Sequence, residues 1–505
     1  MKMFESLCDK TLHILFALMM GCIYIAVLYY DRIPENPFPS VALLPNGVYY
    51  AAALLLLAGV LTCLKRRKRS DLSPRQFYLI LLSIAALVII LHVCIARWIP
   101  IGLGRDFGKV RNMAMHLADG GTFADNGIYF VTNPNNVSIT ILFSWILKII
   151  HSWRAVIFAG MLCVNLTAVL TGMTIRNWTG SSGAGIFACV LAEVLAGLTW
   201  RCFIPYTDNY GMIFVSLMLW EYSLPVRKEW KAPLIVLTAM IGSWIKITVL
   251  IALLGIVIHA VLLLIGNRSK ADSKMEGRKF ALSLGLCLAV IAAGFMTGKA
   301  IEHRYAFATD EKHTMGWQYY FMMGQDESGI GTVAGQEYRL IKEEVNEKYD
   351  GKKERMDAFL NAGLNFVRRK GVRGNLIFAL KKLNLAYSDG QFHNMQTYEE
   401  DVSDDSILYE LYFREGKYSF VIAEIMQLIW SLVLVMIGLS VVQIGGSENA
   451  NSRLLKIILI GVTLYVLLFE VRSKYLYMYV PLYILLAVNS AASFKVIQFI
   501  HGCRS

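Results

Sequence analysis

The chain has 505 residues, of which 56% are hydrophobic and only 17% are charged, and its mean hydropathy is +0.50; soluble domains carry about 25% charged residues. The net charge is +12, but the lysines and arginines gather in short loops between apolar runs, which is the charge pattern that orients membrane proteins. This composition excludes an ordinary soluble domain and gives no reason to expect a nucleic-acid partner.

Apolar runs long enough to cross a bilayer recur along the whole chain. The fold class expected from them is an all-α polytopic membrane protein. The first run lacks a small-residue cleavage site and is expected to remain as a span. We predict about twelve transmembrane helices, near residues 11–30, 48–64, 76–98, 155–174, 183–200, 210–224, 232–246, 247–265, 280–297, 418–441, 455–470 and 474–492.

The basic loops predict which way the chain is oriented. Residues 65–70, 226–231 and 267–279 are rich in lysine and arginine and fall on one side of a twelve-span protein. Such loops mark the cytoplasm, so both termini of this cell-membrane protein are expected there. The apolar run 137–150 is short for a span, and counting it as one would move residues 226–231 outside. We therefore expect it to form a juxtamembrane helix.

This topology divides the chain into four parts. We expect an N-terminal two-helix extension (1–70) and a transmembrane core (71–297) that contains the first external loop (99–153). An α-rich extracytoplasmic module (298–417) of ordinary polarity follows, and the C-terminal helices (418–505) complete the chain. The nine cysteines form no C-x-x-C pair, so neither a zinc site nor a disulfide framework is expected.

Asp106 begins a segment with helical periodicity in the first external loop. Phe107, Val110 and Leu117 recur on one face, which predicts an amphipathic helix at the membrane interface. Asp106 would take the N-cap position of that helix, although Lys109 stands where a capping box requires Glu or Gln. From these residues alone, a capping role and a chemical role stay equally open, and the two are compatible.

A second carboxylate and a group of asparagines lie on the same predicted side. Asp208 follows the helix breaker Pro205, and a cap is again the simple alternative to a chemical role. Two carboxylates at one aqueous boundary could act as base, metal ligand or acceptor clamp. Asn133, Asn135 and Asn136 could orient a ligand that carries hydroxyl groups, although Asn is also an ordinary turn residue.

Three cations are expected at this boundary too. Lys246 lies between two apolar runs and could either snorkel or hold a phosphate. Arg472 and Lys474 lie outside, against the charge rule, and an anionic lipid phosphate would explain them. The tyrosines that follow suit an interfacial aromatic belt or, less well, the stacking of a sugar; they are Tyr475, Tyr477, Tyr479 and Tyr483.

These features, in this order, resemble the GT-C superfamily of polyprenyl-phosphate-dependent glycosyltransferases, whose hallmark is an aspartate in the first large external loop. The branch with protein mannosyltransferases and lipid A aminoarabinose transferases is similar, above all its Gram-positive bacterial members. The resemblance runs from about residue 76 to the C-terminus. The matching segments are "TNPNN" (132–136), "PYTD" (205–208), "IKIT" (245–248), "MMG" (322–324), "SDGQF" (388–392) and "RSKYLYMYVP" (472–481).

The resemblance implies an inverting transfer of a sugar from a polyprenyl-phosphate donor to a hydroxyl acceptor on the extracytoplasmic face. That acceptor could be an envelope glycan, a polymer, a lipid or a protein. Asp106 would be the general base and Asp208 a supporting carboxylate. Donor phosphate would be held by Lys246, Arg472 and Lys474. No cofactor is firmly implied, and a divalent metal stays open. Substrate contacts are expected from Arg105, Asn133, Asn135, Asn136 and Tyr206.

Two other classes of function remain open. A transporter or flippase of lipid-linked sugars would carry charges at the bilayer midplane, but Glu193 and Glu221 are nearly the only charges within the predicted spans. A non-catalytic subunit for assembly of envelope polymers would use the extracytoplasmic module for binding and would tolerate Asp106→Asn.

Overall fold

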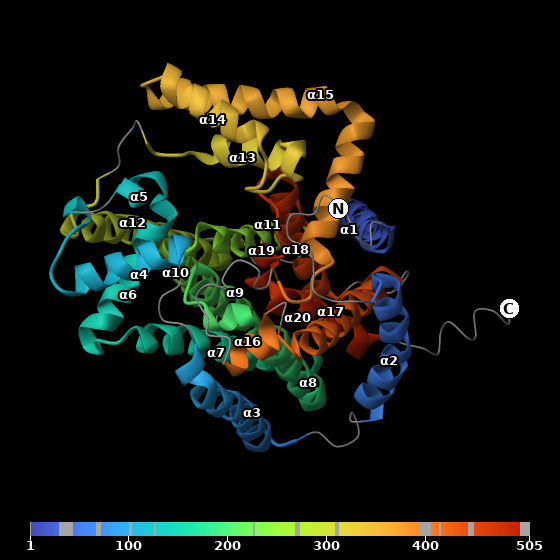
Figure 1. Cartoon of the computed structure of the whole chain (residues 1–505). Coiled ribbons are helices and arrows are strands. Elements are labelled where there is room, and N and C mark those ends of the chain that lie inside the picture. Colours follow the sequence, from blue (N-terminus) through green and yellow to red (C-terminus); the bar gives the residue numbers. More distant parts are fainter. Residues whose placement is uncertain are drawn as a thin grey trace.

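The computed structural model describes residues 2–29, 44–66, 72–99, 104–125, 128–225, 228–267, 273–308, 313–392, 406–413, 416–442 and 449–494. Within these ranges all regular secondary structure is helical (Figure 1), which confirms the expected all-α class. The basic loops expected at 65–70 and 226–231 are described only in part, and residues 268–272 of the loop at 267–279 lie outside the described residues.

Each of the twelve apolar segments expected from the sequence contains a helix. These helices are α1 (Lys2–Tyr29), α2 (Asn46–Arg66), α3 (Pro74–Ile95), α7 (Trp153–Thr179), α8 (Ser182–Ala192), α9 (Thr207–Ser223), α10 (Lys228–Ile245), α11 (Leu250–Asn267), α12 (Ser273–Arg304), α17 (Ser419–Val442), α18 (Ala450–Leu468) and α20 (Val480–Ser493). The last expected span, 474–492, is divided, because a separate short helix, α19 (Lys474–Tyr477), precedes α20.

Seven segments of the described chain are long and apolar enough to cross a membrane. They are Leu7–Tyr29, Asn46–Leu64, Pro74–Trp98, Trp153–Thr179, Leu282–Arg304, Ser419–Val442 and Ala450–Leu468. Shorter apolar helices occupy Ser182–Gly197, Trp230–Ile245, Ile247–Leu263 and Val480–Ser493. The protein is therefore an integral membrane protein with several candidate spans.

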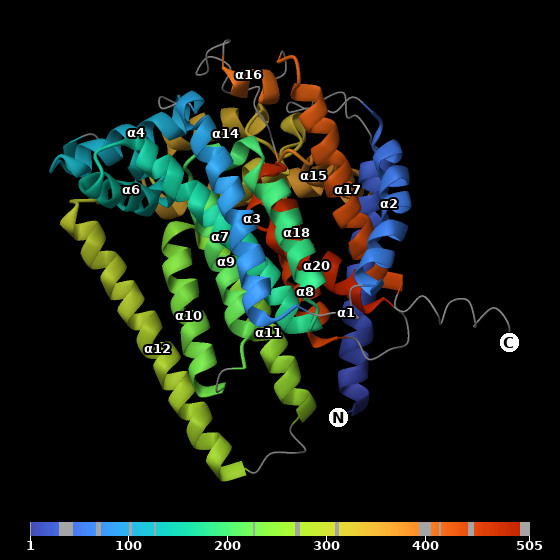
Figure 2. The same ribbon diagram turned by 90° about the horizontal axis from the view of Figure 1, so that it is seen from below.

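The core lies where α7, α8, α9, α17 and α20 pack together. Every residue of α20 from Val480 to Ala491 is buried, which is the pattern of a helix surrounded by other helices. By contrast, the apolar part of α12 is not buried at all inside the protein, and the helix lies at the periphery in Figure 2. An apolar helix exposed in this way is suited to contact with lipid.

Short helices gather at one end of the long ones. In Figure 2, α4 (Arg105–Ala118), α5 (Ile128–Thr132) and α6 (Val137–Ile149) lie across the upper end of the bundle, and α4 packs against α6. Val110, Ala114 and Leu117 of α4 are buried, whereas Asn112 is exposed. This confirms the amphipathic character expected for α4, and α6 lies across the bundle as expected for the run 137–150.

The described part of the expected extracytoplasmic module is also helical. It comprises α13 (Trp317–Gln325), α14 (Glu337–Lys348), α15 (Lys352–Tyr387) and α16 (Ile407–Tyr412). Helix α15 turns sharply at Gly371 (Figure 1), whose φ of +61° strongly favours glycine. Beyond this bend α15 packs against α1 and α18. The module is thereby anchored to the long helices.

Candidate functional site

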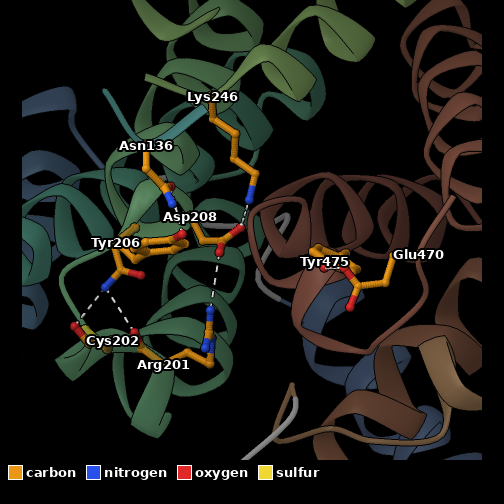
Figure 3. Close-up of polar contacts among 9 residues, drawn as sticks. Asn136, Arg201, Cys202, Tyr206, Asp208, Lys246, Glu470 and Tyr475 are labelled. Atoms are coloured by element: carbon orange, nitrogen blue, oxygen red, sulfur yellow. Dashed lines mark hydrogen bonds and ion pairs between the residues drawn. The ribbon is translucent and has the colours of Figure 1, made fainter. Parts of the chain in front are cut away.

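Asp208 lies in the first turn of α9, between two cations (Figure 3). Its Oδ2 is 3.2 Å from Nη2 of Arg201, and its Oδ1 accepts a hydrogen bond from Nζ of Lys246. Asp208 is only 3% exposed and Arg201 only 2%. The adjacent Asn209 donates to the backbone carbonyls of Arg201 and Cys202, 3.0 and 2.9 Å away, and so fixes the turn that carries the arginine.

The expected N-cap role of Asp208 is wrong. Tyr206 has extended backbone angles and is the N-cap, and Asp208 is the second residue of the helix; the side chain of the cap residue makes no hydrogen bond to the helix backbone. The reason is that Arg201 and Lys246 draw the carboxylate away from the free backbone N–H groups. These ion pairs are formed inside the protein, where they are stronger than at a surface.

Lys246 confirms its expected place between two helices. Its backbone is extended where α10 ends, and a short 3₁₀ turn (Ile247–Val249) leads into α11. The side chain is 17% exposed and crosses to Asp208. Lys246 is therefore not a free cation, because Asp208 pairs with it and with Arg201, and the three side chains together keep one net positive charge.

A chain of hydrogen bonds links the loop before α9 to the segment that carries α4, α5 and α6. The Tyr206 hydroxyl donates to Oδ1 of Asn136 at 2.7 Å, and Nδ2 of Asn136 donates to the Tyr129 hydroxyl at 2.7 Å. The Tyr129 hydroxyl in turn interacts with the Asp106 carboxylate. The ring of Tyr206 also packs edge-on against Phe107, with centroids 4.8 Å apart.

Asp106 lies near the Tyr129 end of this chain of hydrogen bonds, at an exposed position. Its expected N-cap role is wrong as well, because α4 already begins at Arg105 after an extended Gly104, so Asp106 is the second residue of the helix. Burial, and then the charge of Asp106, raises the pKa of Tyr129, which keeps its hydroxyl protonated as a donor. The Asp106 carboxylate is therefore held by a side chain of α5 rather than by the helix backbone.

The segment between α18 and α20 supplies a second charged group. Arg472 Nε is 3.2 Å from Oε1 of Glu470, whose other oxygen accepts a hydrogen bond from the Tyr475 hydroxyl. In Figure 3, Glu470 and Tyr475 lie across from the pair of Asp208 and Lys246. The two groups are also within electrostatic range of each other, because burial lowers the pKa of Lys474 and the charge of Asp208 offsets a small part of that effect.

Lys474 differs from the other cations of the site. Within the described part of the chain its ammonium forms no ion pair. Burial, followed by the charge of Arg472, lowers the pKa of Lys474 to about 7. An incoming anion would stabilise the charged form of a lysine in this setting, because it would replace the hydration that the ammonium loses on burial.

Tyr320 of α13 lies within electrostatic range of both Glu470 and Asp106. Burial raises its pKa to about 12, and the carboxylates of Glu470 and Asp106 both act in the same direction. The described module thus brings a phenol close to both the first external loop and the segment 469–479. These three parts of the chain therefore share one site.

The other expected site residues differ in their positions. Asn136 is buried within the hydrogen-bond chain, whereas Asn133 donates to the Tyr129 carbonyl at 3.1 Å and Asn135 is exposed with a contact to Asn136 at 3.2 Å. The side chain of Arg105 lies outside the described residues. Asn136 is buried and Tyr206 is half-buried, and the hydrogen bond between them supports the site.

The tyrosines of the last segment are structural. Tyr477, Tyr479 and Tyr483 are at most 1% exposed. The first two donate to the backbone carbonyls of Ala196 and Thr248, each at 2.8 Å, and Tyr483 shares a hydrogen bond of 2.8 Å with Tyr387. Both expectations for these three, an aromatic belt and sugar stacking, are wrong because the surrounding helices bury the rings.

The described residues do not fit a divalent metal. No group of three or more His, Cys, Asp or Glu side chains converges among them. Both oxygens of Asp208, which as a supporting carboxylate could have bound either the acceptor or a metal, are already engaged by cations. No chemical step is therefore derived through a metal.

Four residues of the site were not predicted from the sequence: Arg201, Glu470, Tyr129 and Tyr320. Arg201 precedes Asp208 by seven residues, and Glu470 precedes Arg472 by two. Each pair joins opposite charges that are close in the sequence, and that closeness is the signal that could have identified Arg201 and Glu470. Tyr129 and Tyr320 carry no such signal, because phenols are also common in membrane proteins for other reasons.

The fold and this site define a class: an integral membrane protein with a buried cluster of paired charges at one end of its helices. Residues 4–494 match the family described as conserved hypothetical integral membrane protein, and the chain belongs to this family. The matched region includes α1 and α2. Comparison with curated proteins and with solved structures finds no match.

Proposed function

We propose that the protein is a membrane glycosyltransferase of the GT-C type that moves a sugar from a polyprenyl-phosphate donor to a hydroxyl acceptor. The observation that carries this proposal is the continuous arrangement from Asp106 through Tyr129, Asn136 and Tyr206 to the charges around Asp208. It joins an exposed carboxylate to a cation-rich site, and a group transfer from a phosphate ester needs both.

The proposal includes twelve membrane spans, cytoplasmic termini and an extracytoplasmic site. Its support is the arrangement in Figure 2, where α4 and α6 lie at the end of the bundle opposite the C-terminal end of α11 and the N-terminal end of α12. Those two helix ends belong to a basic stretch, residues 267–279, and basic loops face the cytoplasm. A lipid-borne donor could then reach the site from within the bilayer.

The reaction breaks one bond and forms one. Asp106 takes the proton of the acceptor hydroxyl while the acceptor oxygen attacks the anomeric carbon from the face opposite the phosphate, which inverts that carbon. The bond from the anomeric carbon to the phosphate oxygen breaks, and the oxygen keeps the electron pair. Exposure of Asp106 suits this role, because an incoming acceptor must reach its carboxylate.

In this proposal the segment after α18 binds the leaving phosphate. Lys474 has a charge that no described carboxylate pairs with, and Arg472 lies beside it. Lys246 and Arg201 contribute at longer range, since Asp208 already holds both. In this scheme Asp208 organises the cations, and neither it nor Asp106 needs a metal.

In the test, purified protein in lipid nanodiscs is incubated with a panel of polyprenyl-phosphate sugars as donors. Carbohydrates, lipids and peptides are supplied as acceptors. Wild type is compared with Asp106→Asn and with Asp119→Asn, whose carboxylate lies at the far end of α4 and is 63% exposed. We expect transfer by wild type and Asp119→Asn and its loss in Asp106→Asn. Transfer that survives Asp106→Asn contradicts the catalytic assignment, and a failure of every donor to bind contradicts the class.

One observation favours the transporter alternative. Glu193 lies in a π-helical turn (Glu193–Gly197) after α8, is 2% exposed, and neither carboxylate oxygen has a hydrogen-bond partner among the described residues. Isolated carboxyls and π-helical turns both occur at functional sites in membrane helices. If this alternative is correct, Glu193→Gln abolishes movement of a fluorescent lipid-linked sugar between leaflets while Asp106→Asn does not. The opposite pattern supports the transferase.

A further inference from the structure

Residues 469–473 link α18, which ends at Leu468, to α19, which begins at Lys474. They contain Arg472 and have no regular helical structure. Something else must fix their backbone, because unsupported helix ends and loops sample many conformations. The segment is in fact enclosed by hydrogen bonds from the module of α13 and α15.

Lys382 is the centre of this support. It is 0% exposed, and its ammonium donates to the carbonyls of Gly324, Leu467 and Phe469 at 2.7, 2.8 and 2.7 Å. An ammonium has three N–H donors, and each has a carbonyl here. The lysine therefore joins the end of α13 to the end of α18 with its full donor capacity.

Three further contacts act on the same segment. Gln325 donates to the carbonyls of Leu467 and Leu468 at 3.2 and 3.0 Å, the Val471 N–H donates to the Gly331 carbonyl at 3.0 Å, and the Ser473 hydroxyl donates to Asp389 at 2.7 Å. The segment is thus held by its carbonyls, by one of its N–H groups and by a side chain.

This arrangement also gives a role to two motifs of the module. A Cβ atom at Gly324, the last residue of "MMG", would lie 2.6 Å from the Phe469 carbonyl oxygen, so only glycine permits the close approach. Asp389 belongs to "SDGQF" and holds Ser473, which stands between Arg472 and Lys474. Both motifs therefore act on the cation-bearing segment rather than on a separate site.

We propose that Lys382 is a positioning residue through which the module fixes residues 467–473, so that docking of the module and binding of a lipid phosphate at Arg472 and Lys474 are coupled. The coupling rests on the proposed function, whereas the positioning does not. By linkage, a phosphate bound at the segment would stabilise the module's contacts, and loss of those contacts would weaken phosphate binding by the same factor.

Hydrogen exchange of the full-length protein in nanodiscs tests both parts. Lys382→Met keeps the length of the side chain and removes its donors, and Lys353→Met, at an exposed position of the same helix, is the control. Without ligand, we expect the Val471 amide to exchange about tenfold faster or more in Lys382→Met and unchanged in Lys353→Met. Gln325→Met, which keeps Lys382, should give a smaller increase at the same amide if Lys382→Met does not fold.

Polyprenyl phosphate is then added to the same samples. In wild type we expect slower exchange in residues 324–331 as well as 467–473, and about tenfold weaker phosphate binding in Lys382→Met. Wild-type exchange rates at Val471 in both Lys382→Met and Gln325→Met would overturn the positioning role. Protection confined to 467–473 would overturn the coupling. If wild type binds no polyprenyl phosphate, the proposed function fails, while the ligand-free rates still decide the positioning role.

Discussion

Replacing Asp208 by Asn removes the only charge that balances Arg201 and Lys246 within the described cluster. Arg201 is 2% exposed and cannot recover its hydration without moving, while the Lys246 side chain is 17% exposed and can turn toward water. Removing one partner of a buried ion pair costs about 3–5 kcal/mol. We expect Asp208→Asn to lose free energy of unfolding in that range.

Two further variants separate this effect from a general loss of contacts. Arg201→Met leaves Asp208 paired with Lys246, so the expected loss is smaller, about 1–3 kcal/mol. The exposed carboxylate of Asp119 gives the control, and Asp119→Asn should change stability by less than about 1 kcal/mol. The double variant Arg201→Met/Asp208→Asn should lose less than the sum of the two single losses.

Reversible unfolding in mixed micelles, followed by tryptophan fluorescence, measures these differences. The expected order of losses is Asp208→Asn, then Arg201→Met, then Asp119→Asn. If Asp208→Asn is as stable as Asp119→Asn, or if Arg201→Met loses more than Asp208→Asn, the description of a carboxylate buried between two cations is wrong.

Three further predictions concern activity and binding. Tyr129→Phe removes the hydroxyl between Asn136 and Asp106, so we expect sugar transfer to fall about tenfold while the unfolding free energy changes by only about 1 kcal/mol; an unchanged rate would contradict the role of this link. Because the pKa of Lys474 is lowered to about 7, its charged form predominates below that pH, and affinity for a singly charged phosphodiester donor should fall about tenfold between pH 6 and pH 8. The variant Lys474→Arg should show no such fall, and a pH-independent wild type would refute the assignment. Removal of divalent metals by a chelator should leave transfer within about twofold, because both Asp208 oxygens are engaged by cations; an activity that requires added Mg²⁺ or Mn²⁺ would show otherwise.

The helices could be predicted from the sequence because the pattern that determines them is local. Each of the twelve apolar runs contains a helix, and the three- and four-residue spacing around Val110 locates α4 with its buried face. The break at Lys246 also follows from the sequence, since the apolar run there is too long for one span. These features depend on neighbours along the chain, which the sequence shows directly.

Charge pairing was not predictable in the same way. Arg201, Asp208 and Lys246 come from three different elements, and only their packing brings the side chains together. The same packing explains the two wrong N-caps, because tertiary partners hold Asp106 and Asp208 where a local rule assigns their carboxylates to the backbone. The misassigned tyrosines have a similar cause, since their burial depends on helices far away in the chain.

Separating donor binding from chemistry in Asp106→Asn tests the central claim most directly. The measurement takes the donor affinity and the single-turnover rate of sugar transfer from the same nanodisc preparation, for wild type and Asp106→Asn. Because Asp106 acts on the acceptor proton and not on the phosphate, the donor affinity should stay within about twofold while the rate falls by about 10²–10⁴. Transfer by Asp106→Asn at the rate of wild type would contradict the claim.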